Sequence, residues 1–142
     1  MEALGRLNNV AAVADGAYVS LKAAEGVLFI GYLATTGDTF TLTEAKDAAG
    51  TGAQVLTKIT RFHTNKGDGT DAWVLTTQAA SSTAVKTAAA AQSAIAIEVD
   101  DSQLSDGYTY LKCTSTGAAT VVAIMHDLKV QRKPVNLVAV GV

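Results

Sequence analysis

The sequence has few residues of several types, and each shortage excludes a class of structure or function. With one cysteine, Cys113, the chain cannot form an internal disulfide, which fits a reducing compartment. The longest apolar run covers residues 27–34 and is interrupted by Gly31. That run is far shorter than the roughly 20 residues that cross a bilayer as a helix. The first 15 residues lack the basic start and the continuous apolar stretch of a secretory signal. We therefore expect a soluble chain that is made in the cytoplasm and does not bind a membrane.

Catalytic chemistry is also sparsely supplied. The only histidines are His63 and His126, and the sequence contains no CxxC or HExxH pair, no phosphate loop and no dinucleotide fingerprint. His126 is predicted to lie on the core-facing side of its strand as a packing residue, and His63 to be exposed. Cys113 is predicted to be a small buried core residue. We therefore expect no enzymatic activity, no cofactor and no metal.

Two groups of acidic residues are better explained by turns than by ligands. Residues 65–71 (Asn-Lys-Gly-Asp-Gly-Thr-Asp) are faintly similar to a calcium loop but lack the terminal bidentate glutamate. A hairpin loop is predicted there instead. Asp100, Asp101 and Asp106 are predicted to cap and close turns.

Alanine, valine, threonine and glycine carry most of the composition. Hydrophobic residues make up 49% of the 142 positions, while aromatic residues make up 6% and charged residues 17%. The β-branched Val and Thr favour pleated, half-buried surfaces. The net charge is −2, and the single basic cluster is the small group Lys129, Arg132 and Lys133. This balance predicts one globular domain that does not bind nucleic acid directly.

Alternating apolar and polar residues recur along the middle of the chain and predict consecutive strands. Residues 39–43 direct Phe40 and Leu42 toward the core, and residues 93–99 do the same with Ile95, Ile97 and Val99. Residues 27–33 form a nearly unbroken apolar run, which is typical of a strand buried on both faces.

The remaining segments complete an all-β pattern. Residues 54–64 and 72–76 flank a strong turn signal and are predicted to form a hairpin, and two further strands cover 108–114 and 120–130. Residues 79–92 are interpreted as a loop or short strand, and residues 100–104 as one helical turn. In the last strand, one face is predicted to be buried: Val122, Ile124, His126, Leu128 and Val130. We therefore predict an antiparallel β-sandwich or jelly roll of about eight strands, with extended arms at both ends.

Three zones divide the chain: an N-terminal arm or short helix at 1–16, a sandwich domain at 17–130 and an apolar tail at 131–142. The tail follows Pro134, the only proline, and carries no charge beyond it. An uncovered apolar segment favours aggregation, so a partner or the domain itself is expected to cover it. Trp73, the lone tryptophan, is either a core plug or an interface anchor. The candidate partner-binding residues are therefore Leu4, Leu7, Val10, Trp73, Val135, Leu137, Val138, Val140 and Val142.

Three stretches resemble the head-decoration, or cement, proteins of tailed bacteriophages. They are residues 31–45 (GYLATTGDTFTLTEA), residues 104–112 (LSDGYTYLK) and residues 126–134 (HDLKVQRKP). The resemblance implies a small β-sandwich or jelly roll on the outside of an icosahedral capsid, where it stabilises contacts between major capsid subunits. It further implies the major capsid protein as the partner and a dimer or trimer on the lattice. It assigns no role to an individual residue.

Other functions remain open at this level. One is another virion β-sandwich, such as a tail or head-fibre component. Another is a carbohydrate-binding module, which would need exposed aromatic rings on one face. The candidate rings are Tyr18, Tyr32, Trp73, Tyr108 and Tyr110.

Overall fold

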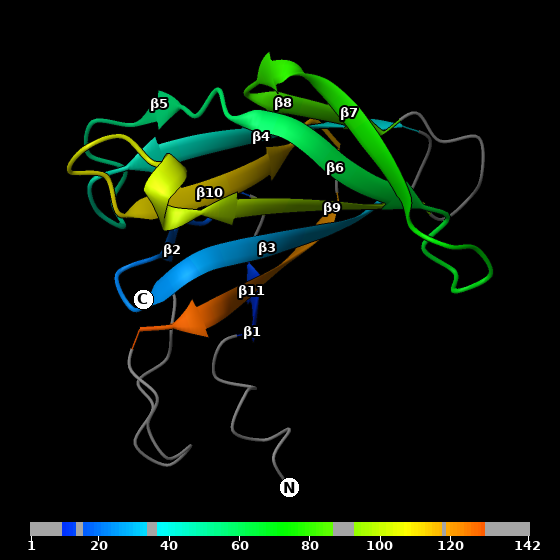
Figure 1. The fold of residues 1–142 in the computed structure, drawn as a ribbon, viewed down its shortest axis with the longest axis horizontal. Coiled ribbons are helices and arrows are strands. Elements are labelled where there is room, and N and C mark those ends of the chain that lie inside the picture. Colours follow the sequence, from blue (N-terminus) through cyan, green and yellow to red (C-terminus); the bar gives the residue numbers. More distant parts are fainter. Residues whose placement is uncertain (1–9, 14–15, 34–36, 87–92, 118, 130–142) are drawn as a thin grey trace, which may run out of the picture.

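The computed structural model describes residues 10–13, 16–33, 37–86, 93–117 and 119–129 of the 142-residue chain. Within these ranges the protein is all-β, with eleven strands in two antiparallel sheets and one short 3-10 helix (Figure 1). The predicted all-β antiparallel sandwich is confirmed, with more strands than the expected eight. The difference arises from strands of two to four residues, which are too short to produce a recognisable alternation.

The larger sheet has six strands in the order β1-β11-β3-β9-β6-β7. Their bounds are β1 (Val10–Val13), β3 (Ala24–Leu33), β6 (Ile59–Asn65), β7 (Val74–Ser81), β9 (Ser93–Asp100) and β11 (Thr120–Leu128). The second sheet has five strands, with β2-β10-β4-β5 in order and β8 paired to β4. Their bounds are β2 (Val19–Ser20), β4 (Asp38–Ala45), β5 (Gln54–Val55), β8 (Thr83–Lys86) and β10 (Tyr110–Ser115).

The core lies between the two sheets and is filled by alternate residues of the long strands. Phe40 and Leu42 of β4 are fully buried, which confirms their predicted direction. Ile95, Ile97 and Val99 of β9 are buried in the same core, also as predicted. Gly31 of β3 leaves room for the Phe40 ring of the opposite sheet, which occupies the place where a Cβ would stand.

Two predicted strand faces are wrong. Residues 27–33 are not buried on both faces: Val27, Phe29 and Leu33 face the core, but Tyr32 is 43% exposed. The outer face of the six-stranded sheet carries no second layer within the described residues, so one face of β3 remains partly open.

The core face of β11 was also assigned incorrectly. Val121, Ala123 and Met125 are buried, whereas Val122, Ile124, His126 and Leu128 are only half-buried. Both sets of alternate residues in β11 are apolar, so alternation alone could not choose between them. His126 therefore lies on the outer face rather than in the core. Val130, assigned to the same face, lies outside the described residues.

The remaining local predictions are partly confirmed. β6 and β7 pair as the predicted hairpin, and the predicted helical turn is the 3-10 helix η2 (Asp101–Gln103). Residues 54–64 are not one strand, because the chain leaves the five-stranded sheet after β5 and enters the six-stranded sheet at β6. Within 79–92, the described part contains the end of β7 and the whole of β8.

Two buried carboxylates fasten the turns of the five-stranded sheet. Glu44 on β4 is 1% exposed and accepts hydrogen bonds from the Ser105 backbone N–H at 2.8 Å and from the Ser105 hydroxyl at 2.5 Å. Asp38, at the start of β4, is 7% exposed and accepts hydrogen bonds from Thr116 and Gly117 in the β10–β11 turn. Since β10 and β11 belong to different sheets, Asp38 holds the connection between the layers.

Candidate binding surfaces

The two ends of the described chain leave the sandwich at the same place. β1 and β11 pair antiparallel, with Val10 opposite Ile124 and Val13 opposite Val121. Val10 is the first residue of β1, and β11 ends four residues past Ile124, at Leu128. The segment before Val10 and the segment after Lys129 therefore start from neighbouring strands at one end of the six-stranded sheet (Figure 1).

The point where the C-terminal segment leaves is held firmly. The Lys129 backbone N–H donates to the Ala23 carbonyl at 2.9 Å, and the Lys129 ammonium pairs with the Asp101 carboxylate on η2. Asp127 adopts a positive φ of 51°, which re-aims the chain after β11. These contacts hold Lys129, the last described residue, against the segment before β3 and against η2.

His126 lies beside this exit between two carboxylates. Its Nδ1 is 2.9 Å from Asp127 Oδ2, and its Nε2 is 3.5 Å from Glu98 Oε1 on β9. The imidazole ring covers Gly26 of β3 so closely that a side chain there would collide with it. Glycine at position 26 is therefore what allows the histidine to lie flat on the sheet.

The predicted binding residues of the arms are only partly described. Val10 lies in β1, so residues 10–13 take the extended form of the arm rather than the short helix. Leu4 and Leu7 lie outside the described residues, as do Val135, Leu137, Val138, Val140 and Val142. Their role in partner binding stays a prediction.

Trp73 is not a core plug, because 42% of its surface is exposed. It precedes β7, directly after a loop that is closed by its own polar side chains. Asp71 accepts a hydrogen bond from the Lys66 backbone N–H at 2.9 Å, and Asp68 accepts one from the Thr70 backbone N–H at 2.9 Å. These carboxylates therefore accept hydrogen bonds within the loop and stabilise its turn, as predicted for residues 65–71.

The two residues that follow Trp73 are exposed and apolar, although they are not among the predicted binding residues. Val74 is 59% exposed and Leu75 is 53% exposed, so three consecutive large side chains face solvent at the start of β7. The available signal was charge: residues 72–81 contain no charged residue. Such a segment is unusual for a solvent-exposed strand.

Three tyrosines in or beside the five-stranded sheet each lie under a lysine. The distances from ammonium nitrogen to ring centroid are 4.8 Å for Lys112 over Tyr18, 5.0 Å for Lys22 over Tyr110 and 5.5 Å for Lys46 over Tyr108. A sugar ring would have to stack where these ammonium groups lie. The arrangement therefore disfavours a carbohydrate platform on this face.

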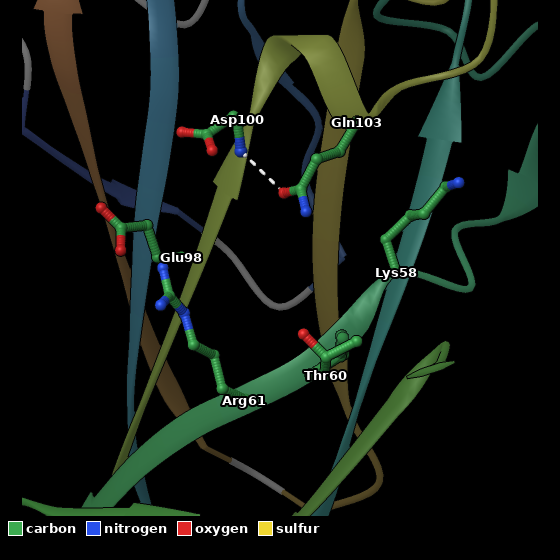
Figure 2. A pocket seen from close by; sticks show the side chains of 7 residues that line it. Lys58, Thr60, Arg61, Glu98, Asp100 and Gln103 are labelled. Atoms are coloured by element: carbon green, nitrogen blue, oxygen red, sulfur yellow. Dashed lines mark hydrogen bonds between the residues drawn. The ribbon is translucent and has the colours of Figure 1, made fainter. Parts of the chain in front are cut away.

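A small polar hollow lies between β6, the end of β9 and η2. Figure 2 shows Arg61 on β6 reaching toward Glu98 on β9, while Gln103 accepts a hydrogen bond from the Asp100 backbone N–H at 3.0 Å. Its volume is about 40 Å³, room for a few waters at most. The hollow is too small to enclose an organic substrate.

The residues with the most reactive side chains do not lie together in one site. Cys113 is buried in the core, His126 lies on the outer face of the six-stranded sheet, and His63 is exposed on β6. In the described part of the chain, no three His, Cys, Asp or Glu side chains are grouped as a metal site would require. No helix in these ranges is long and apolar enough to span a membrane.

Comparison with known proteins adds no relative. No family model matches the sequence, no curated protein is significantly similar to it, and no solved structure matches it significantly.

Proposed function

We propose that this protein is a structural component of a tailed-bacteriophage virion that binds the outside of the capsid and stabilises contacts between major capsid subunits. In this proposal it is made in the host cytoplasm, uses no cofactor and catalyses no reaction. Its partner is the major capsid protein, and it occupies the lattice as a dimer or trimer.

The pairing of β1 with β11 is the observation that carries the proposal. Val10 lies opposite Ile124, four residues before β11 ends, so the two arms join the domain at neighbouring strands. The N-terminal arm carries Leu4 and Leu7 among polar residues, and the C-terminal tail is apolar beyond Pro134. Arms that join neighbouring strands can engage the same neighbouring subunit, and an extended apolar segment binds well by adding a strand to a sheet. Two weak attachments of this kind reinforce each other by raising the effective concentration.

Two of the three stretches that resemble decoration proteins are paired in the structure. The first three residues of β10, which belong to residues 104–112, pair with β4, which belongs to residues 31–45, and Lys112 lies opposite Thr43. Glu44 and Ser105, whose hydrogen bonds stabilise this part of the sheet, come one from each stretch. These two stretches are therefore in contact, which supports a shared scaffold.

A capsid binder acts by mass action, since it stabilises only the assembled lattice to which it binds. Many copies with modest individual affinity can therefore stabilise a shell. This mode of action needs a rigid domain with binding segments at its margin, and no active site.

The test removes the C-terminal arm and measures two properties. Deleting residues 135–142 is expected to reduce co-sedimentation with capsid shells while changing the melting temperature of the isolated domain little, because in this proposal the segment packs on a capsid subunit and not on its own domain. A control of equal length, with these residues replaced by a Gly/Ser sequence, separates the loss of apolar side chains from the loss of chain length. Wild-type occupancy of the shells by the truncated protein would contradict the proposal, and so would failure of that protein to fold.

A further inference from the structure

The edge strands of the two sheets differ greatly in length. β2 and β5 have two residues each, and β1 and β8 have four. β7 has eight residues and forms the outer edge of the six-stranded sheet, with β6 on one side and no described strand on the other. Proteins commonly protect an edge by keeping it short, charged or interrupted by proline. The four other edges are short, and β7 is not.

β7 also lacks the other protections. Residues 72–81 contain neither charge nor proline, and Trp73, Val74 and Leu75 are 42%, 59% and 53% exposed. Val74 and Leu75 point to opposite faces, so β7 is open on both sides. One device is present: the ladder with β6 shifts register between Ile59 and Arg61, opposite the second half of β7. The regular, accessible edge is therefore Val74–Thr77.

We propose that this edge pairs with the same edge of a second copy of the chain. A two-fold axis pairs the edge with itself in the reverse direction, so a charge at the axis would meet its own copy and like charges near the axis would lie close together. The absence of charge from residues 72–81 makes β7 compatible with itself. An antiparallel pair related by an axis normal to the sheet keeps every residue on its own face. With the axis at Leu75, that side chain meets its own copy, and Val74 meets Thr76.

The contact is small, because only Val74–Thr77 are regular and Trp73 adds one ring. Interfaces well below about 1,200 Å² are typically weak and transient. The pairing is therefore weak in free solution and populated where copies are concentrated. It uses the edge of the six-stranded sheet opposite β1, so it leaves the arms at β1 and β11 accessible.

A concentration series tests the pairing directly. Sedimentation equilibrium from ~1 μM to ~1 mM is expected to show a monomer–dimer equilibrium for the wild-type chain. Leu75→Lys is expected to weaken association at least about tenfold, since two ammonium groups would oppose each other. Val85→Lys, at a 51% exposed site on β8, is the matched control and should leave association unchanged. An equimolar mixture of Leu75→Lys and Leu75→Glu should restore the dimer.

A crosslink tests the register. Directly opposed strand residues have Cα atoms about 4.5–5.5 Å apart, within the range for a disulfide. Leu75→Cys in a Cys113→Ser background should therefore oxidise to a covalent dimer, whereas Val85→Cys should not. If Leu75→Lys does not fold, Leu75→Glu places two carboxylates opposite each other at the same point and serves the same purpose.

Several results would overturn the proposal. One is a wild-type chain that stays monomeric across the series and yields no Leu75→Cys crosslink. Another is a dimer that Leu75→Lys and Leu75→Glu each leave intact. A dimer that disappears when residues 135–142 are deleted would show that the tail, and not β7 of the second copy, occupies the edge. None of these results depends on capsid shells, so they are separable from a failure of the capsid proposal.

Discussion

Replacing Asp38 with alanine removes the acceptor that connects the start of β4 to the turn between β10 and β11. Asp38 Oδ1 accepts hydrogen bonds from the Thr39 N–H at 2.7 Å, the Thr116 N–H at 2.7 Å, the Thr116 hydroxyl at 2.7 Å and the Gly117 N–H at 3.0 Å. The side chain is 7% exposed, so water cannot simply take its place.

The cost of the substitution can be worked from these contacts. The Thr39 N–H keeps the Thr116 hydroxyl as a second acceptor at 3.2 Å, and the Thr116 N–H keeps the Thr39 carbonyl at 3.1 Å. The Gly117 N–H and the Thr116 hydroxyl lose the acceptor that holds them. Hydrogen bonds to charged groups contribute about 1.5–3 kcal/mol each, and Gly117 is exposed to replacement water. The expected loss is about 3 kcal/mol, or a fall in melting temperature of about 10 °C for a domain of this size.

Urea unfolding followed by far-UV circular dichroism measures this loss. Asp106→Ala, which removes an exposed turn carboxylate, is the control and should stay within about 0.5 kcal/mol of wild type. Asp38→Asn should lie between wild type and Asp38→Ala, because it keeps one oxygen acceptor. A loss below about 0.5 kcal/mol for Asp38→Ala would refute the view that this carboxylate holds the sheets' connection.

Gly31→Val should destabilise the fold by at least about 2 kcal/mol in the same urea assay, because its Cβ would stand where the Phe40 ring lies. Unchanged stability would mean that the two sheets can separate at this point. Hydrogen bonds from Thr51 hold the pKa of Asp47 below its ordinary value of 3.8. The ionised carboxylate should therefore stabilise the turn above pH 3.8, and this stabilisation should be lost as the pH falls through the lowered pKa. A carboxyl titration by NMR checks the direction, and a midpoint at or above 3.8 would oppose it. Cys113→Ser and His126→Gln should preserve binding to capsid shells wherever the variant remains folded, since both residues act through packing; lost binding with an unchanged melting temperature would reopen the case for an active site.

Much of the fold could be predicted because several strands alternate cleanly. In residues 39–43 and 93–99 the apolar side chains fall on one face, and Phe40, Leu42, Ile95 and Ile97 are buried accordingly. β11 lacks that contrast, since Val122 and Ile124 are as apolar as Val121 and Met125. Ala123 and Met125 are nonetheless the fully buried residues, and an alternation with two apolar sides could not select them.

The candidate surfaces were harder to predict, because they depend on the order of strands in the sheets. The apolar character of residues 131–142 is visible in the sequence, but the origin of both arms from one end requires the pairing of β1 with β11. The sequence alone allows Trp73 either a role in the core or a role at an interface, and its 42% exposure excludes the core. The lysine–tyrosine pairs join residues far apart in the chain, such as Lys112 and Tyr18, which no local pattern connects.

The most direct test of the capsid proposal is the binding of the purified chain to assembled shells of the major capsid protein that lack it. The account predicts saturable co-sedimentation at a fixed ratio of copies to capsid subunits, and shells that disassemble at a higher temperature once they are occupied. Absence of saturable binding to intact shells, at concentrations where the chain is folded and monodisperse, would contradict it.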